Sequence, residues 1–170
     1  MVAKYPSMAK KQEHHPEPLD ALDVRILDLL QQDALLPVQE IAKRVGSSKS
    51  VVWRRVQGYV DSGLIRERVA VLDHKQAGFG IMVFTQVKVA QHGRDRLPAF
   101  VEAVRRFPQV IECHTLLGDV DFLLKIVVRD MEEYEQFIWS KLMRIEGVQD
   151  LKSSISLTKF VYTHRLPIHT

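Results

Sequence analysis

Residues 19–65 read LDALDVRILDLLQQDALLPVQEIAKRVGSSKSVVWRRVQGYVDSGLI, and this segment alone predicts three short helices. Asp20 is a good N-cap for the first helix. The apolar residues behind it recur at helical spacing, and they are Leu22, Ile26, Leu27, Leu29 and Leu30. Pro37 is expected to open the second helix as its first residue, and Gly46 to end it. The inward positions of this second helix are Ile41, Ala42 and Val45.

The third helix follows after a very short turn. Ser47 or Ser48 caps it, Gly63 ends it, and its inward residues are Val51, Val52, Val56, Tyr59 and Val60. Two helices joined by a tight Gly-Ser turn are typical of a helix-turn-helix. Leu64-Ile65 and Val69–Leu72 then predict a short extended pair that would serve as a wing. The expected first domain is therefore a winged helix-turn-helix over residues 19–72.

The outward face of the third helix is polar and basic. The side chains opposite the valines are Lys49, Ser50, Trp53 and Arg54. Hydroxyls and free amides at Ser47 and Ser48 suit a phosphate, and lysine, arginine and serine suit base edges or phosphates. Trp53 suits a sugar or a thymine methyl group, with a half-buried surface ring as the alternative. This pattern predicts a face that binds double-stranded DNA.

Three further arginines flank this face. Arg55 lies on the helix flank, where either an acid of the first helix or a DNA phosphate suits it. Arg66 and Arg68 lie in the predicted wing and are expected to neutralise phosphates. Residues 19–40 contain one base and five acids, whereas residues 41–68 contain seven bases and two acids. Such a polarised domain suits a polyanion, although two solvated helix faces without a partner would give the same count.

A second pattern starts after a predicted hinge at residues 73–80. Strands are predicted at Ile81–Val89, Val110–Leu117, Phe122–Val128 and Val148–Val161, and helices at Leu97–Phe107 and Met131–Leu142. The order β-α-β-β-α-β is that of a ferredoxin-like unit. We therefore expect an α+β protein whose second domain, ferredoxin-like, spans residues 81–170.

Composition restricts the class of protein. The chain has 170 residues, 46% hydrophobic and 26% charged, which is ordinary for a globular protein, and its formal net charge is only +3. Residues 1–18 carry no apolar period and predict a disordered tail. One cysteine excludes an internal disulfide framework, no apolar run is long enough to cross a membrane, and the N-terminus is no signal peptide. Together these features predict a cytoplasmic protein.

The quoted segment resembles the N-terminal domain of the Lrp/AsnC family, the leucine-responsive and feast/famine transcription regulators. The matching residues are Leu19, Asp20, Asp23, Ile26, Leu27, Val45, Gly46, Ser48, Ser50, Val52, Arg55, Val56, Gly63, Leu64 and Ile65. The second domain resembles the same family at Leu117–Leu124, which is similar to its Gly-x-x-Asp-aromatic-Leu signature. Gly147-Val148, Ser153-Ser154 and Tyr162–Ile168 also match. The resemblance covers residues 19–168.

This resemblance implies a function and a set of partners. Homodimers would assemble into tetramers or octamers and bind pseudo-palindromic promoter DNA, with half-sites about one turn or a multiple apart. A small amino-acid effector would bind between dimers, beside the Gly-x-x-Asp turn. The candidate effector residues are Thr115, Gly118, Asp119, Asp121, Met131, Tyr134, Ser153 and Ser154. Either aspartate suits the effector's ammonium, and local turn chemistry is the alternative reading for both.

The sequence offers three alternatives: a metal site, an enzyme of similar architecture, and a stand-alone effector-binding or assembly module, against which the presence of residues 19–72 argues. Cys113 and His114 are adjacent on a strand and point to opposite faces, so no metal site is expected, and no cofactor is expected either. Siroheme decarboxylases, which are enzymes, are similar in two-domain architecture. They would need basic and histidine residues gathered in a cavity, for which His74, His92, His114 and His164 qualify by type only. The intact serine, lysine and arginine face of the third helix favours the regulator.

Overall fold

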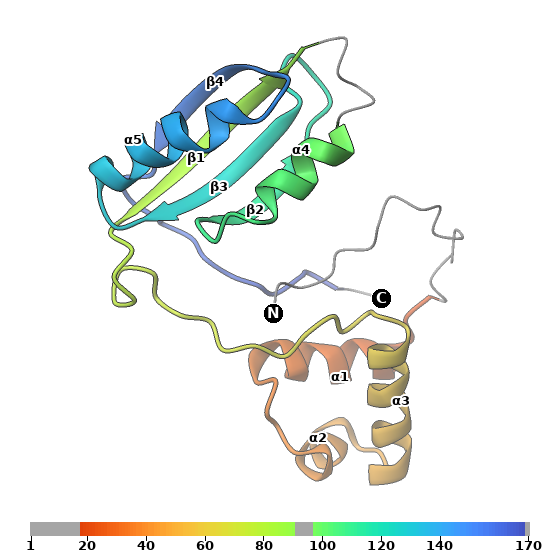
Figure 1. The fold of residues 1–170 in the computed structure, drawn as a ribbon. Helices are drawn as coiled ribbons and strands as arrows, with labels where there is room; N and C mark the ends of the chain where they lie inside the picture. The colour runs from red at the N-terminus through yellow and green to blue at the C-terminus, as the bar shows by residue number, and fades with distance from the viewer. Residues whose placement is uncertain (1–17, 91–96, 169–170) are drawn as a thin grey trace. The chain divides into compact units, whose positions relative to one another are not determined.

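The computed structural model describes residues 18–90 and 97–168, which form two compact units (Figure 1). Val71–Phe160 make up one unit. The described residues up to Ala70, together with those from Val161 onward, make up the other. The predicted disordered tail lies outside the described residues except for Pro18. No helix within the described ranges is both long and apolar enough to cross a membrane.

The helical unit contains the three predicted helices. They are α1 (Ala21–Gln32), α2 (Val38–Val45) and α3 (Lys49–Asp61). Asp20 and Asp23 form a capping box at the start of α1, in which each carboxylate accepts from the other's amide. The core consists of Ile26, Leu27, Leu30, Ile41, Ala42, Val45, Val52, Val56 and Tyr59, all at most 8% exposed. The apolar spacing in the sequence therefore identified this core, although Val60 remains 44% exposed.

The turn between α2 and α3 has the predicted chemistry. Gly46 adopts a left-handed backbone with φ 66°, and the Ser47 amide donates to the Ala42 carbonyl at 2.9 Å. Pro37, expected as the first residue of α2, lies at the N-cap instead. Its ψ of 140° is extended, so the helix begins one residue later at Val38.

The predicted wing is wrong. Among the described residues, 62–80 contain no strand. Gly63 adopts φ 76°, and the Ile65 amide donates back to the Tyr59 carbonyl at 2.9 Å, so Leu64-Ile65 completes the end of α3. That amide is not available to a strand pair, and only three residues separate it from Val69. The following segment is exposed, with Val69 67% and Leu72 76% accessible.

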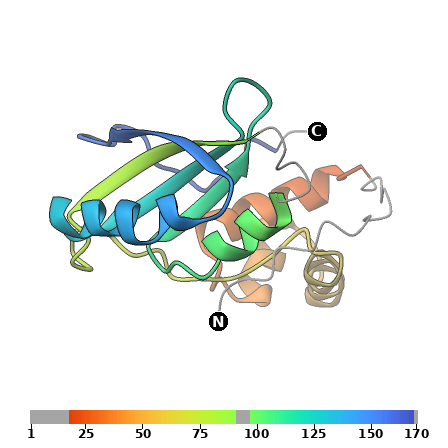
Figure 2. The same ribbon diagram turned by 45° about the horizontal axis from the view of Figure 1, so that its top comes forward.

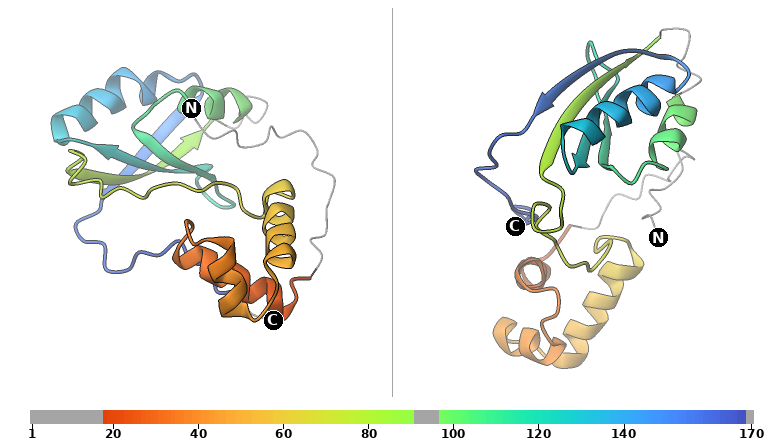
Figure 3. Two further views of the ribbon diagram at one scale, coloured as in Figure 1. Left: turned by 90° about the horizontal axis from the view of Figure 1, so that it is seen from below. Right: turned by 60° about the vertical axis from the view of Figure 1, so that its left-hand side comes forward.

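The other unit is a ferredoxin-like β-α-β-β-α-β arrangement. Its elements are β1 (Ile81–Val89), α4 (Leu97–Val104), β2 (Val110–Thr115), β3 (Phe122–Val128), α5 (Met131–Ser140), the 3₁₀ turn η2 (Leu142–Arg144) and β4 (Val148–Ile155). The strands form one antiparallel sheet in the order β2-β3-β1-β4. Both helices cover the same face of that sheet (Figures 2 and 3). Their shared core with the sheet includes Phe100 of α4, whose ring lies 4.4 Å from that of Phe122.

The last predicted strand ends earlier than expected. β4 stops at Ile155, and the Ser156 amide makes one more bond to the Met82 carbonyl at 2.9 Å. Because β4 runs antiparallel to β1, which begins at Ile81, the chain beyond that point has no strand left to pair with. Residues from Val161 onward, expected to close the second domain, belong to the helical unit.

Candidate nucleic-acid interface and ligand pocket

The outward face of α3 is fully formed in the structure. Lys49, Ser50, Trp53 and Arg54 are all exposed, and the Trp53 side chain is 57% accessible. Ser50, Trp53 and Arg54 follow the i, i+3, i+4 spacing that places side chains on one side of a helix. The buried Val52 and Val56 hold the opposite side against α1 and α2. This face of α3 is therefore exposed to solvent, and an α-helix has a width that the major groove of DNA admits.

The start of α3 is shaped by its two serines. Ser48 is the N-cap, and its hydroxyl accepts from the Val51 amide at 3.3 Å and lies 3.1 Å from the Ser50 hydroxyl. Ser47, half-buried, belongs to the turn itself through its bond to Ala42. The hydroxyl of Ser48 therefore caps the N-terminus of α3. The first-turn amides of the exposed α3 start retain the orientation that favours an anion.

Arg55 is engaged inside the helical unit. Its Nη1 donates to Asp23 Oδ1 at 2.6 Å and to Asp20 Oδ2 at 2.7 Å. The Tyr59 hydroxyl donates to the same Asp23 oxygen at 2.5 Å. Hydrogen bonds to Asp23 and Asp20 raise the pKa of Arg55, and burial followed by the bond to Asp23 raises the pKa of Tyr59 far above its usual value. Of the two partners that the sequence allowed, the structure has the acids of the first helix.

Arg66 and Arg68 are exposed beyond the end of α3, in the segment that forms no wing. Their charges extend the basic side of the unit past the helix. Sequence reasoning missed Gln57, which is exposed and lies four residues after Trp53 and three after Arg54. The same spacing rule that selected Ser50 and Arg54 identifies it, and an amide is a good reader of adenine.

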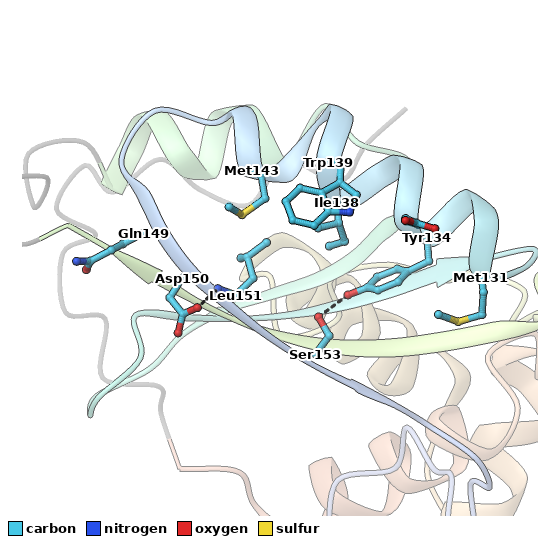
Figure 4. Close-up of a pocket in the computed structure, with 10 residues that line it drawn as sticks. Met131, Tyr134, Ile138, Trp139, Met143, Gln149, Asp150, Leu151 and Ser153 are labelled. Atoms are coloured by element: carbon cyan, nitrogen blue, oxygen red, sulfur yellow. Dashed lines mark hydrogen bonds between the residues drawn. The ribbon is translucent and has the colours of Figure 1, made fainter.

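A pocket of about 470 Å³ lies between α5 and β4 (Figure 4). Two of its lining residues carry hydroxyls, and Tyr134 donates to Ser153 at 2.5 Å and lies 2.9 Å from the Thr85 hydroxyl behind the pocket wall. Thr85 is completely buried. The apolar walls come from Met131, Ile138, Trp139, Met143 and Leu151, and the polar rim from Glu135, Gln149 and Asp150. Sequence reasoning named Met131, Tyr134 and Ser153 but missed Trp139, which is 62% exposed.

The other candidate effector residues lie elsewhere. Gly118 and Asp119 are in the exposed β2–β3 turn, and Thr115 ends β2. The Asp121 amide donates to the Val87 carbonyl at 3.0 Å, and its Oδ2 accepts from the Val89 amide at 2.8 Å. One oxygen of Asp121 thus secures the end of β1, a contact between strands that is distinct from the local turn chemistry expected as the alternative for this residue.

Within one chain, the turn and the pocket are separate. Asp121 bonds to Val89, whereas Ser153 is paired with Thr85, four residues earlier on β1, or about 13 Å along the strand. They also flank β1 on opposite sides, because β3 and β4 are its two neighbours. Ser154 pairs with Phe84 and faces away from the helices, so of the two serines only Ser153 lines the pocket.

Two family profiles cover most of the chain. The AsnC-type helix-turn-helix domain matches residues 19–58, and the Lrp/AsnC ligand binding domain matches residues 82–166. The chain belongs to the Lrp/AsnC family. The resemblance that the sequence motifs indicated is therefore confirmed, and the protein is a transcription regulator of the Lrp/AsnC type.

Named relatives of this Lrp/AsnC regulator support the same assignment. It is 36% identical over 150 residues to the glutamate uptake regulatory protein of Zymomonas mobilis, covering 88% of this chain and 91% of that one. It is 32% identical to the DNA-binding transcriptional activator DecR of Escherichia coli, covering 88% and 99%. A crystal structure of an AsnC family regulator from Agrobacterium tumefaciens matches with TM-score 0.81 at 39% identity, over 87% of this chain and 96% of that one.

A further solved structure carries a ligand. It is a transcriptional regulator from Neisseria meningitidis in complex with L-Met, with TM-score 0.82 at 33% identity, covering 88% of this chain and 96% of that one. The named relatives of this Lrp/AsnC protein are regulators, which decides against the siroheme decarboxylase alternative. Of the histidines considered for it, His92 lies outside the described residues.

Cys113 of this Lrp/AsnC chain is an exposed residue of β2. Desolvation of its sulfur raises the pKa of the thiol to about 11, and Arg105 only partly offsets the effect. The neighbouring His114 lies 3.2 Å from Glu112, which also accepts from Lys125 at 2.6 Å. Within residues 18–90 and 97–168, no group of three potential metal ligands gathers.

Proposed function

We propose that this Lrp/AsnC regulator reads promoter DNA by placing α3 in the major groove. In this arrangement Lys49, Ser50, Trp53 and Arg54 contact base edges or fix the register on the duplex. Arg66 and Arg68 neutralise phosphates, and the first-turn amides of α3 beside Ser48 bind one, while the Ser47 amide stays in the turn through its bond to Ala42. The observation that carries the proposal is the exposed, partly cationic row Ser50–Trp53–Arg54 on a helix whose other side is locked in a core. Arg55 acts here through its ion pairs and not through DNA.

The proposed DNA-binding domain is residues 19–72, followed by a hinge at residues 73–80 and a sensing and assembly domain that begins at residue 81. The regulator would work as a homodimer on a pseudo-palindromic site, with half-sites about one helical turn or a multiple apart. A protein with this task acts in the cytoplasm, where the chromosome is.

A gel-retardation titration tests the DNA interface directly. If Arg54 reads a base, Arg54→Ala should weaken binding to a selected promoter fragment by about 1–3 kcal/mol. Arg129→Ala is the matched control, because Arg129 is an exposed arginine of the sheet unit that pairs with Glu133. Unchanged affinity of the Arg54 variant would remove this residue from the interface. Loss of affinity in both variants would show a purely nonspecific attraction.

We infer that the pocket between α5 and β4 takes the side chain of a small apolar amino acid. Its walls are a tryptophan, two methionines, an isoleucine and a leucine, which suit an unbranched or branched aliphatic group. The acids on its rim, Glu135 and Asp150, suit the ammonium of the same ligand. The L-Met complex of the Neisseria meningitidis relative supports this ligand class.

The separation of turn and pocket supports a shared site between subunits. Gly118, Asp119, Asp121 and Thr115 of one protomer would meet Met131, Tyr134 and Ser153 of another, with Ser154 on the opposite face of the sheet. Leu117 is fully exposed at the tip of the turn, where a monomer gains nothing from an apolar side chain. Dimers joined in this way would form the tetramer or octamer that the family resemblance predicts.

Calorimetry against the twenty amino acids, with L-methionine first, tests the sensing function. We expect heat from at least one apolar amino acid, and a change in DNA affinity of about 1–3 kcal/mol on its addition. Trp139→Ala should reduce the affinity for that amino acid, whereas Trp53→Ala, at the other tryptophan, should leave it unchanged. No heat with any amino acid would refute the sensor role while leaving DNA binding intact.

A further inference from the structure

Over residues 18–90 and 97–168, the chain passes between its two units twice. The first passage lies between Ala70 and Val71, and the second between Phe160 and Val161. A single linker would leave the two units joined at one place only. Here the residues after β4 return to the helical unit, so the described part of the chain connects the units at two places (Figure 1). We call residues 161–168 the C-terminal strap.

The C-terminal strap is held on α1 by paired polar contacts. Arg165 Nη2 donates to Asp28 Oδ1 at 2.7 Å. The Leu166 amide donates to Gln31 Oε1 at 2.6 Å, and Gln31 Nε2 donates back to the Leu166 carbonyl at 3.3 Å. Ile168 packs against the helical core beside these bonds. The oxygen and the nitrogen of the Gln31 side-chain amide thus bond to the amide and the carbonyl of Leu166. This pair of bonds fixes the position of the strap along α1.

These contacts are of a kind that can be released. The side chains of Arg165 and Asp28 are 50% and 44% exposed, and ion pairs in such positions contribute little to stability. Every strap residue from Val161 to Pro167 is exposed, and only Ile168 is half-buried. A segment with few buried apolar contacts and exposed hydrogen bonds belongs to the low-stability end of a structure. We therefore expect the strap to open at a low cost in free energy.

The strap follows β4, which lines the pocket, after a short connecting segment. Asp150, Leu151 and Ser153 of β4 face the ligand pocket, and the last pairing bond of this strand is made by Ser156. Only eight residue steps separate Ser153 from Val161, which limits their distance to about 28 Å when fully extended. A change in the position or pairing of β4 therefore reaches α1 through a short chain segment.

We propose that the C-terminal strap is a releasable second tether, which couples the strand β4 of the pocket to helix α1 of the DNA-binding unit. The proposal rests on the proposed function for what α3 and the pocket bind. It adds the route by which the two influence each other. Arg165 and Gln31 are the positioning residues of this route, since neither needs to contact DNA or the amino acid.

The first experiment measures docking alone, by amide hydrogen exchange on the full chain. In the wild type, the Leu166 amide should be protected. Arg165→Glu and Asp28→Arg should each speed its exchange about tenfold or more, because each places like charges together. The double variant Asp28→Arg/Arg165→Glu restores opposite charges and should restore protection. An unprotected Leu166 amide in the wild type, or a double variant no better than the single ones, would overturn the proposal.

The second experiment measures coupling, and it needs no amino acid. Binding linkage is reciprocal, so DNA that binds α3 must alter the strap and β4 if these are coupled. A promoter fragment that the wild type retards is added, and exchange is followed in α3, in the strap and in β4. We expect slower exchange in α3 together with a several-fold change at residues 150–156 and 161–168. In Arg165→Glu the change in α3 should remain, while the change in β4 disappears.

Two results would overturn the coupling. One is a wild type in which DNA alters α3 only, and the other is an Arg165→Glu variant in which β4 still responds in full. Failure of the proposed function would look different. A pocket that takes no amino acid gives no heat in calorimetry, and a helix α3 that does not read DNA gives no retardation. Neither of these outcomes depends on the state of the strap.

Discussion

Arg55 of α3 donates to Asp23 of α1 at 2.6 Å, in a partly buried contact between the two helices. The same guanidinium nitrogen also reaches Asp20, the N-cap of α1, at 2.7 Å. Asp23 in turn accepts from Tyr59, one turn further along α3. Three charged groups and a phenol therefore join α3 to the start of α1. If α3 reads DNA as proposed, this contact positions it.

Removing Arg55 should lower the free energy of unfolding more than it lowers the intrinsic affinity for DNA. Arg55→Met keeps much of the apolar stem but leaves Asp23, whose side chain is only 15% exposed, without its cation. We expect a loss of about 1–3 kcal/mol in the free energy of unfolding of the helical unit. Urea denaturation followed by circular dichroism measures this loss.

Arg54→Ala is the matched control for that experiment, since Arg54 neighbours Arg55 but is exposed on the outward face. It should leave the urea midpoint within about 0.5 kcal/mol of the wild type while weakening DNA binding. If Arg55→Met is as stable as the wild type but fails to bind DNA, Arg55 contacts phosphate and the positioning role is wrong.

The same cluster predicts how stability depends on pH. The Asp23 amide and the Arg55 guanidinium hold the pKa of Asp20 below its ordinary value of 3.8. A carboxylate with a lowered folded pKa contributes stability above that ordinary value, and the contribution is lost as the pH falls through the lowered pKa. Acid titration of the unfolding free energy should therefore show a loss below about pH 4 that is smaller in Arg55→Met.

Tyr59 predicts how stability changes at alkaline pH. Burial and the bond to Asp23 raise its pKa above the ordinary value of 10.0, so its contribution is present below that value and is lost as the pH rises further. Ultraviolet absorbance should show one tyrosine that ionises only with unfolding. Tyr59→Phe should remove that step. A Tyr59 phenolate forming near pH 10 in the folded protein would contradict the burial of its hydroxyl.

Two glycines of the helical unit should respond oppositely to alanine. A Cβ at Gly58 or at Gly46 meets no other atom within 4 Å, so space is equal at both sites. Gly58 lies inside α3, where alanine is favoured by about 1 kcal/mol, whereas Gly46 has φ 66°, where alanine is strained. Gly58→Ala should raise the melting temperature by a few degrees, and Gly46→Ala should lower it. A fall in both would mean that Gly58 is needed for another contact.

The sequence predicted most of the fold because its signals are local. The spacing of Ile26, Leu27 and Leu30 identified a buried helix face, and the alternation in Ile81–Val89 identified a strand with the observed bounds. The wing failed because Ile65 is needed to end α3, which depends on a backbone bond to Tyr59 that no side-chain pattern encodes. The apolar run at Val69–Leu72 has the composition of a strand but no partner in the described chain.

The site was only partly predictable for a similar reason. Arg54 and Trp53 follow from helical spacing alone, so the exposed face of α3 could be named residue by residue. The candidate effector residues came from three sequence segments, and only the hydrogen bonds and the sheet register show that Asp121 and Ser153 meet β1 at different places. The docking of Arg165 on Asp28 joins residues 137 positions apart, and nothing in either segment indicates it.

The two tryptophans, Trp53 on α3 and Trp139 beside the pocket, offer a final prediction. Both rings are exposed, at 57% and 62%, so each should emit as a solvated indole in the free protein. Trp139→Phe leaves Trp53 as the reporter, and DNA should then quench the emission or shift it to shorter wavelength. Trp53→Phe leaves Trp139, which should respond to the apolar amino acid found by calorimetry.

Each reporter supplies the control for the other. DNA added to the Trp53→Phe variant should produce a smaller signal than in the Trp139→Phe variant, because Trp139 lines the pocket and not the outward face of α3. If DNA changes the Trp139 signal as strongly as the Trp53 signal, and the Arg165→Glu substitution abolishes only the former, the strap transmits DNA binding to the pocket. A Trp53 that does not respond to bound DNA would place the interface on another surface.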